Sequence, residues 1–420
     1  MNIIKIVFYT DDYNFYVRNA NIFDTIGNFL RKVNEDLQTN FHSVYLKGKQ
    51  LESLETFNNL IEDLQYNAFF LTNDPCFDLN LKEMRIDLNN YQIIEEIQSS
   101  NYNHMLKAID IRTNKNVVLR FFSSFQINRS YGFLIFSKFN LPGTVKIHGY
   151  KFFLNEEEKN RFNIESDSSF VVVSDYIPNG SIKNIMREYF QSNGRINARM
   201  NPTIKSKIIF GVASIIKQLN QKKCFLRNIS IIDDFFLDEN LEPIIVKYSS
   251  VGFKKGIDEF EVSPIASPLY KAPEVFSDEG EYGTQSNVYS FAIFLYQMFS
   301  TTNNLILDDG RGRICSPHNL MMRIYKGARL IRPQNIPDHY WELIVNCWSN
   351  DQYKRPTITN IVKYLRDDIF ALEEFGIHTN LDELHEYQNR IDVDDEHKIA
   401  LLEEENAKLK RRVNSMLRQQ

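Results

Sequence analysis

The sequence predicts an α+β protein that is built from several folded parts, and three observations lead to this expectation. The first part alternates short β-rich runs with one amphipathic helical pattern. The middle of the chain mixes apolar strand-like runs with longer helical segments, and the end repeats apolar residues every three or four positions. The parts we expect are residues 1–75, a linker at 76–90, residues 91–370, a helical and polar linker at 371–395, and a terminal helix at 396–420.

The composition indicates a chain with enough apolar residues to build large cores. Hydrophobic residues make up 43% of the 420 residues, with 32 Phe and 21 Tyr, which argues against a disordered chain. The net charge of −5 gives no overall basic surface for nucleic acid, and the four cysteines lack metal-ligand spacing. No apolar run approaches the ~18 residues that span a membrane, and the first residues lack a signal-peptide core. We therefore expect a cytoplasmic protein with neither a nucleic-acid nor a membrane partner.

The first 75 residues read as a small sheet with one helix. Strand-like runs occur at 3–7, 15–17, 43–46 and 68–71, and a helix with Thr25 near its start follows the second run. This order, together with the segment Val44-Tyr45-Leu46-Lys-Gly-Lys-Gln-Leu, resembles the β-grasp fold of ubiquitin-like domains. The segment ends without a terminal diglycine, so we expect an embedded domain and not a conjugated modifier. The resemblance implies a partner-binding strand at Tyr45, whereas the other interpretation is a single exposed aromatic residue.

The middle of the chain carries motifs of a second family. Residues 267–274 read Ser-Pro-Leu-Tyr-Lys-Ala-Pro-Glu, and Cys347-Trp348 and Arg355-Pro-Thr follow. Together these motifs resemble the C-lobe of a protein kinase, closest to the tyrosine-kinase-like branch. The resemblance implies a bilobal fold, with an N-lobe at 91–175 and a C-lobe at 176–370. It also implies a buried structural ion pair between Glu274 and Arg355.

Several positions in the N-lobe depart from the kinase pattern. The glycine-rich loop, which lets the backbone approach the nucleotide phosphates, has Gln98, Ser100 and Asn103 in place of its glycines. The phosphate-binding lysine is replaced by Arg120, which is longer and planar, although it could still grip a phosphate. The other interpretation of Arg120 is a surface arginine at a strand end. The partner glutamate of that lysine aligns with Gly132, so its ion pair cannot form there.

The catalytic positions in the C-lobe depart further. Aligned through Leu-Asp-Glu-Asn-Leu-Glu-Pro at 237–243, the catalytic base falls on Ile229, which cannot accept a proton. The magnesium-binding asparagine becomes Asp234, and the main magnesium-binding aspartate becomes Lys247, which reverses the charge. We hypothesise that Lys247 pairs with Asp234 and so fills the metal site from within.

These substitutions predict a catalytically inactive kinase homologue, a pseudokinase, that acts as a scaffold or allosteric regulator in signalling. No catalytic residue, no metal and no cofactor is expected. ATP binding without magnesium would depend on Arg120, Ser174 at the gatekeeper position, and Asp234. One alternative is an atypical ATP-binding serine/threonine kinase with weak activity. A second alternative is a ubiquitin-pathway adaptor.

The activation segment retains two Ser-Pro pairs, at Ser263 and Ser267. Another kinase could phosphorylate these serines, and the phosphate could then dock on Lys254, Lys255 or Lys271. The other interpretation is that both serines are turn residues.

The terminal helix shows heptad spacing. Its a and d positions are Ile399, Leu402, Asn406, Leu409, Val413 and Met416. An asparagine at an a position favours a parallel dimer in a fixed register, so we expect a coiled-coil homodimer. The alternative is an amphipathic helix that docks on the kinase-like domain of its own chain. Protein partners are also expected through the kinase-like and ubiquitin-like domains.

Overall fold

A computed structural model describes the protein in two stretches. The described residues are 3–72 with gaps at 11–14, 22, 39–42, 47–48, 55 and 58–68, and 86–392 with gaps at 101–102, 124–135, 137–140, 153, 165–167, 192–198, 228–229, 254–267, 277–282, 301–306, 309–315 and 335.

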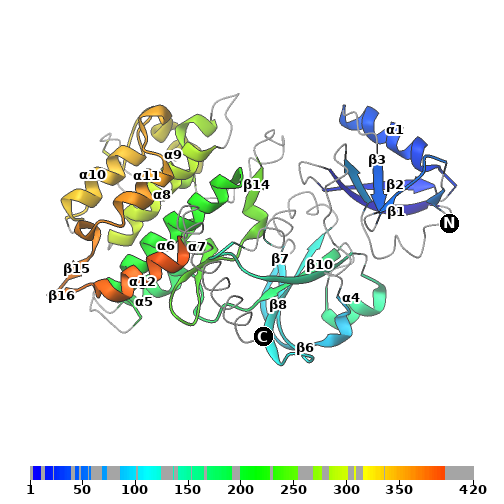
Figure 1. The fold of residues 1–420 in the computed structure, drawn as a ribbon, viewed down its shortest axis with the longest axis horizontal. Coiled ribbons are helices and arrows are strands. Elements are labelled where there is room, and N and C mark those ends of the chain that lie inside the picture. The colour runs from blue at the N-terminus through cyan, green and yellow to red at the C-terminus, as the bar shows by residue number, and fades with distance from the viewer. Residues whose placement is uncertain are drawn as a thin grey trace, which may run out of the picture.

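In the described residues of the N-terminal part, a five-stranded mixed sheet is accompanied by helix α1 (Figure 1). Its elements are β1 (Ile3–Thr10), β2 (Phe15–Asn21), α1 (Ile26–Leu37), β3 (Ser43–Leu46), β4 (Lys49–Gln50) and β5 (Phe69–Thr72). The strand order is β2-β1-β5-β3-β4, and the two central strands, β1 and β5, run parallel. Helix α1 begins where the Thr25 side chain accepts a hydrogen bond from the Asn28 amide. The ring of Phe29 on α1 packs edge-to-face on Phe57 at 5.4 Å.

A second five-stranded sheet follows, and it is antiparallel throughout. Its strands are β6 (Tyr91–Ser100), β7 (Asn103–Asp110), β8 (Lys115–Ser123), β9 (Ile147–Phe152) and β10 (Ser168–Asp175), in the order β6-β7-β8-β10-β9. Helix α4 (Glu156–Phe162) places Phe162 against Phe121 of β8, with ring centroids 5.5 Å apart. These strands lie within residues 91–175, the range expected for the N-lobe.

The core of this sheet extends into the expected linker. Leu88, in the short helix η3 (Leu88–Asn90), is 1% exposed and packs in the same core as Tyr91 and Phe121. The Ile86 amide donates to the Tyr150 carbonyl of β9. Residues 86–90 therefore belong to the sheet, and the boundary expected at residue 90 lies at least four residues too far along the chain.

The C-lobe is mainly helical (Figure 1). Its α-helices are α5 (Ile182–Gln191), α6 (Pro202–Gln221), α7 (Ile231–Asp234), α8 (Thr284–Phe299), α9 (Pro317–Tyr325), α10 (Asp338–Cys347) and α11 (Ile358–Tyr364). Short strands β11 (Cys224–Leu226) and β14 (Val251–Phe253) pair with each other, as do β12 (Phe235–Leu237) and β13 (Pro243–Ile245). Helices α6 and α8 are buried along almost their whole length, which explains why their apolar residues do not keep to one face.

The segment expected to be a linker at 371–395 is folded as far as Asp392. It contains β15 (Glu373–Glu374), β16 (Ile377–His378) and α12 (Leu381–Ile391). Leu384, Tyr387 and Ile391 of α12 are buried, whereas Leu381 is exposed. The linker prediction is wrong for residues 371–392, which we call the C-terminal extension, because these apolar residues lie on the C-lobe and not in solvent.

The expected coiled coil at 396–420 lies outside the described residues. Among the residues that the structure describes, no helix is both long and apolar enough to cross a membrane.

Candidate functional site

The residues that the sequence predicts for nucleotide and metal binding, which we call the cleft residues, come from β8, β10 and the segment that surrounds the β12–β13 hairpin. On β8 the alternation of side chains sends Leu119 and Phe121 into the N-lobe core and Phe122 into the larger core of the C-lobe. Arg120 therefore lies on the same face as Phe122. In the backbone register it pairs with Met105 of β7 and Val172 of β10.

Arg120 is held by its neighbours. Its guanidinium carbon lies 5.1 Å from the ring centroid of Tyr248, within the range of a cation–π contact. Its Nε lies 3.1 Å from the Met105 sulfur. The arginine at the phosphate-lysine position thus reaches from β7 to the residue that follows Lys247.

Tyr248, the residue after Lys247, is packed in the core. It is 1% exposed, and its ring meets those of Phe122 and Phe136 at 6.1 and 6.3 Å. Burial raises the pKa of its hydroxyl to about 12, although the positive charge of Arg120 opposes the shift. The tyrosine therefore stays neutral at physiological pH.

The hypothesised pair of Lys247 and Asp234 is present in the structure. The Lys247 Nζ lies 3.2 Å from both carboxylate oxygens of Asp234. Asp234 is 8% exposed, and its Oδ2 also accepts a hydrogen bond of 2.8 Å from the Ser230 amide. Burial raises the pKa of this carboxyl, whereas the lysine charge and the hydrogen bond from Ser230 oppose the shift. A cation of the chain itself thus compensates a buried carboxylate.

The loop around this pair shows further features that the sequence did not single out. The Ser230 hydroxyl donates to Asp233 at 2.6 Å, and Lys183 of α5 forms an ion pair with Asp233 at 2.7 Å. Ile231 and Ile232, between the expected base position Ile229 and Asp234, are buried in the core. Acidic residues shortly after a serine are common at the start of a helix. The sequence around Ser230 therefore did not predict the ion pair between Lys183 and Asp233.

The structure describes some of the remaining predicted site residues but not others. Ser174, at the gatekeeper position, lies on β10 and is 8% exposed. Lys271, a proposed phosphate partner, is buried and 7% exposed. The expected base Ile229, Gly132, both Ser-Pro serines and the side chains of the glycine-loop positions and Tyr45 lie outside the described residues.

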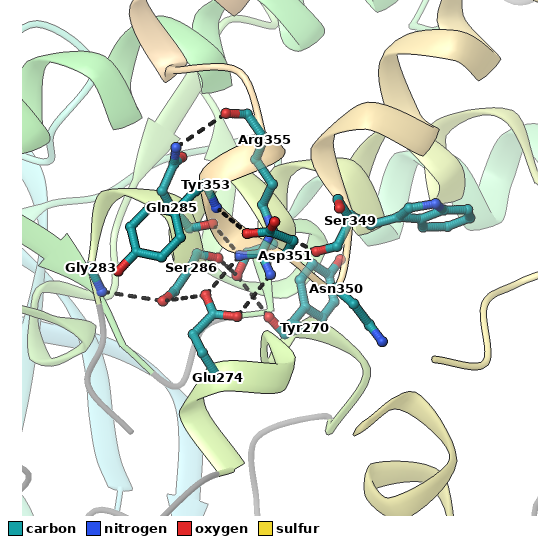
Figure 2. A network of polar contacts seen from close by, with 12 residues as sticks. Tyr270, Glu274, Gly283, Gln285, Ser286, Ser349, Asn350, Asp351, Tyr353 and Arg355 are labelled. Carbon is teal, nitrogen blue, oxygen red and sulfur yellow. Dashed lines mark hydrogen bonds and ion pairs between the residues drawn. The ribbon is translucent and has the colours of Figure 1, made fainter. Parts of the chain in front are cut away.

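The expected structural pair of Glu274 and Arg355 is formed (Figure 2). Two parallel hydrogen bonds, of 2.7 and 2.8 Å, join the guanidinium to the carboxylate. Arg355 also donates to the carbonyls of Ser349 and Gln285, and the Ser286 hydroxyl donates to Glu274. The arginine side chain is fully buried, so this network joins the short helix η7 (Pro273–Phe276) to α8 and to the segment before α11.

A second polar contact fixes the strand that leads into the catalytic-loop region. The side chain of Asn287 on α8 accepts from the Leu226 amide at 3.1 Å and donates to the Leu226 carbonyl at 2.8 Å. Asn287 is 1% exposed. This reciprocal bond holds the end of β11 against the central helix of the C-lobe.

The described residues contain no group of three or more His, Cys, Asp or Glu side chains that could hold a metal ion. At the expected metal site, the carboxylate of Asp234 is paired with the ammonium group of Lys247. This charge arrangement does not suit a divalent cation, which needs several oxygen ligands.

Comparisons with known proteins agree with this architecture. Residues 160–365 match the family model for protein tyrosine and serine/threonine kinases. Over 199 residues the chain is 28% identical to the probable serine/threonine-protein kinase roco5 of Dictyostelium discoideum, which covers 45% of this chain and 7% of that protein. Over 188 residues it is 24% identical to a putative serine/threonine-protein kinase/receptor of Acanthamoeba polyphaga mimivirus, which covers 43% of this chain and 11% of that protein.

These matches support the protein kinase superfamily, and the chain contains a kinase-like domain. The chain matches only 7% and 11% of the lengths of the two curated relatives.

Proposed function

We propose that the chain is a catalytically inactive kinase homologue, a pseudokinase, that acts as a scaffold or allosteric regulator in intracellular signalling. The contact between Lys247 and Asp234 carries this proposal. Active kinases have an aspartate at the position of Lys247 and an asparagine at the position of Asp234. These two residues hold the magnesium ions that neutralise the nucleotide phosphates. Here an ammonium takes that place, so we propose that the domain works without magnesium.

The position of Arg120 supports the same proposal. Its guanidinium contacts the Tyr248 ring and the Met105 sulfur. Among the described residues, this sulfur is the sole hydrogen-bond acceptor of the guanidinium. A nucleotide that used Arg120, Ser174 and Asp234 would have to draw the arginine away from the tyrosine ring. We therefore propose that the domain needs no cofactor, with metal-free ATP as the one ligand to test.

The network around Glu274 and Arg355 supports a role as a folded scaffold. A bidentate, fully buried arginine pair ties distant segments of the C-lobe together. The chain therefore retains Glu274 and Arg355, which stabilise the fold. At the position of the main metal ligand it has a cation, Lys247, instead of an aspartate. This combination favours a folded domain of the tyrosine-kinase-like branch that binds other proteins.

The names of the two relatives favour a second candidate function. Both are described as serine/threonine-protein kinases, one as probable and the other as putative. Weak ATP-dependent activity would then have to use a base other than Ile229 and a metal arrangement that tolerates Lys247.

For the N-terminal part we propose a ubiquitin-like domain that recruits a protein partner. The mixed sheet with parallel central strands and one helix after the first hairpin supports it. Binding of this sheet to ubiquitin-processing proteins would favour the adaptor function over the signalling scaffold. Loss of binding in a chain that lacks residues 1–75 would assign the contact to this sheet.

For the terminal helix we propose homodimerisation. Sedimentation of the full chain and of residues 1–395 tests this proposal directly. We expect a dimer for the full chain and a monomer for the shortened chain. An unchanged dimer would reject a role for residues 396–420.

The central test is a thermal-shift titration of the full chain with ATP, with and without magnesium. We expect no stabilisation in either condition, since Arg120 is engaged with Tyr248 and Lys247 is paired with Asp234. Stabilisation without magnesium would indicate a nucleotide-sensing pseudokinase, with Arg120 as the phosphate contact. Stabilisation that requires magnesium would contradict the proposed role of Lys247 and favour the weak kinase.

A further inference from the structure

The residues of the Lys247–Asp234 pair lie at the two ends of one short hairpin. Strand β12 starts directly after Asp234, and β13 ends two residues before Lys247. The strands pair from Phe235 with Ile245 to Leu237 with Pro243. At the open end the Val246 amide donates to the Asp234 carbonyl at 3.2 Å. The position of this hairpin therefore sets the distance between the lysine and the aspartate.

The turn of the hairpin is gripped by the C-terminal extension. Arg390 of α12 donates to the Glu242 carboxylate at 2.5 Å, and Lys207 of α6 lies 3.3 Å from the same oxygen. Glu242 is 6% exposed, and both cations form ion pairs with it. The hydrogen bond joins residues that are 148 positions apart in the sequence.

A tyrosine of α12 completes the grip. Tyr387 is 2% exposed and fits beside Gly211, in the middle of α6, and Pro243, at the start of β13. A Cβ atom on Gly211 would lie 2.0 Å from the Tyr387 hydroxyl oxygen and 2.5 Å from Pro243. The guanidinium of Arg390 also lies over the tyrosine ring, 5.4 Å from its centroid. A glycine inside a helix is costly, and here it makes room for α12 against the hairpin.

The rest of the extension has anchors that do not involve the hairpin. Asp392 forms an ion pair with Lys217 at 2.9 Å and with Arg366 at 3.2 Å. Glu374 forms an ion pair with Lys205 at 2.5 Å. The contact between Arg390 and Glu242 can therefore be removed while the extension stays attached to the C-lobe.

We propose that α12 is a clamp that positions the β12–β13 hairpin and, through it, the Lys247–Asp234 pair. The clamp links the C-terminal end of the folded domain to the cleft, whether the cleft is inactive or weakly active. Arg390 is a positioning residue in this scheme, because it does not touch the cleft.

The test compares Arg390→Ala with Arg332→Ala in the full chain by hydrogen exchange. Arg332 is a matched control, because it too is a partly exposed arginine of the C-lobe with a single carboxylate partner, Asp338. We expect Arg390→Ala to speed exchange in residues 235–247 by at least about threefold relative to α8. Arg332→Ala should leave residues 235–247 as they are. Unchanged exchange of the hairpin in Arg390→Ala would overturn the clamp.

A second variant removes the clamp from the other side. In Gly211→Ala the added methyl group collides with the Tyr387 hydroxyl and Pro243, so α12 should exchange faster, and residues 235–247 with it. Faster exchange in α12 alone would overturn the proposal, since the hairpin would then hold its position without the helix. If Gly211→Ala does not fold, Arg390→Ala decides the question.

Discussion

At the scale of the residue, the cleft shows how a charge reversal can be accommodated. A buried carboxylate such as Asp234 is costly unless a cation or hydrogen bonds compensate it. Lys247 supplies the cation, and the Ser230 amide supplies a hydrogen bond. The substitution at position 247 therefore does not leave an orphaned metal ligand behind.

We predict that Lys247→Met destabilises the protein most at higher pH. Burial already raises the folded-state pKa of Asp234 above its ordinary 3.8, and loss of the ammonium should raise it further. A carboxyl with a raised folded-state pKa binds more protons when folded, so its contribution to stability falls as pH rises through the window above 3.8. Because Lys247 is partly exposed, we expect a cost of about 1–3 kcal/mol near pH 8 and a smaller cost near pH 5.

Urea unfolding at the two pH values measures this effect. The double variant Asp234→Asn/Lys247→Met is the control, because it removes the unpaired charge and should recover most of the loss. A loss that is equal at both pH values would contradict the assignment to Asp234.

The Arg355 network leads to a second prediction at this scale. Arg355→Met leaves Glu274 without its bidentate partner and frees two backbone carbonyls. We expect a loss of about 3–5 kcal/mol, which is typical of breaking a buried pair. Denaturant unfolding of Arg355→Met beside Arg332→Ala measures it. A loss below about 1 kcal/mol would be that of an exposed pair and would contradict the burial.

At the scale of the element, α6 is unusual because three of its lysines are buried. Each meets a carboxylate of the C-terminal extension, in the pairs Lys205–Glu374, Lys207–Glu383 and Lys217–Asp392. From the sequence alone, lysines along a helix indicate a face that is exposed to solvent. The extension covers that face, so α6 is buried nearly all round.

We predict that Glu374→Gln weakens the fold in a pH-dependent way. Lys205 is 4% exposed, and burial lowers its pKa while Glu374 opposes the shift. A lysine with a lowered folded-state pKa binds fewer protons when folded, so its contribution to stability increases as pH rises toward its ordinary 10.5. We expect a loss of about 3 kcal/mol near pH 7 that shrinks near pH 9.

Thermal unfolding across this pH range checks the prediction. Glu373→Gln, at the exposed neighbouring position, should change stability little. A loss in Glu374→Gln that did not shrink at higher pH would show that the effect does not come from the charge of Lys205.

At the scale of the whole molecule, the kinase-like domain ends near residue 392 and not near 370. Leu384, Tyr387 and Ile391 of α12 are all buried in the C-lobe core or against α6. Burial of three large side chains contributes about 5–9 kcal/mol, close to the whole stability of a typical domain. We therefore predict that residues 1–370 are largely unfolded or insoluble, whereas residues 1–392 fold.

Circular dichroism melting and gel filtration of the two truncated chains test this boundary. The chain of residues 1–392 is the control, because both lack the terminal helix. If residues 1–370 melted within a few degrees of residues 1–392, the extension would be an accessory and not part of the domain.

Several local features of this protein can be predicted from its amino-acid sequence. The Thr25 cap located the start of α1, and the resemblance to kinase motifs placed the Glu274–Arg355 pair. It also placed a lysine against an aspartate in the cleft, because both positions lie in a short, well-aligned stretch. Such features depend on neighbours in the chain, or on motifs with nearly fixed spacing.

Only the tertiary structure decided where the domain begins and ends. Leu88 and the C-terminal extension read as linker because their apolar residues are few and widely spaced. Their partners lie far away in the sequence, as Glu242 does from Arg390, 148 residues apart. Burial of the α6 lysines likewise follows from which segment covers that helix. Local periodicity carries no information about such contacts, because it records which face a side chain takes and not what lies opposite it.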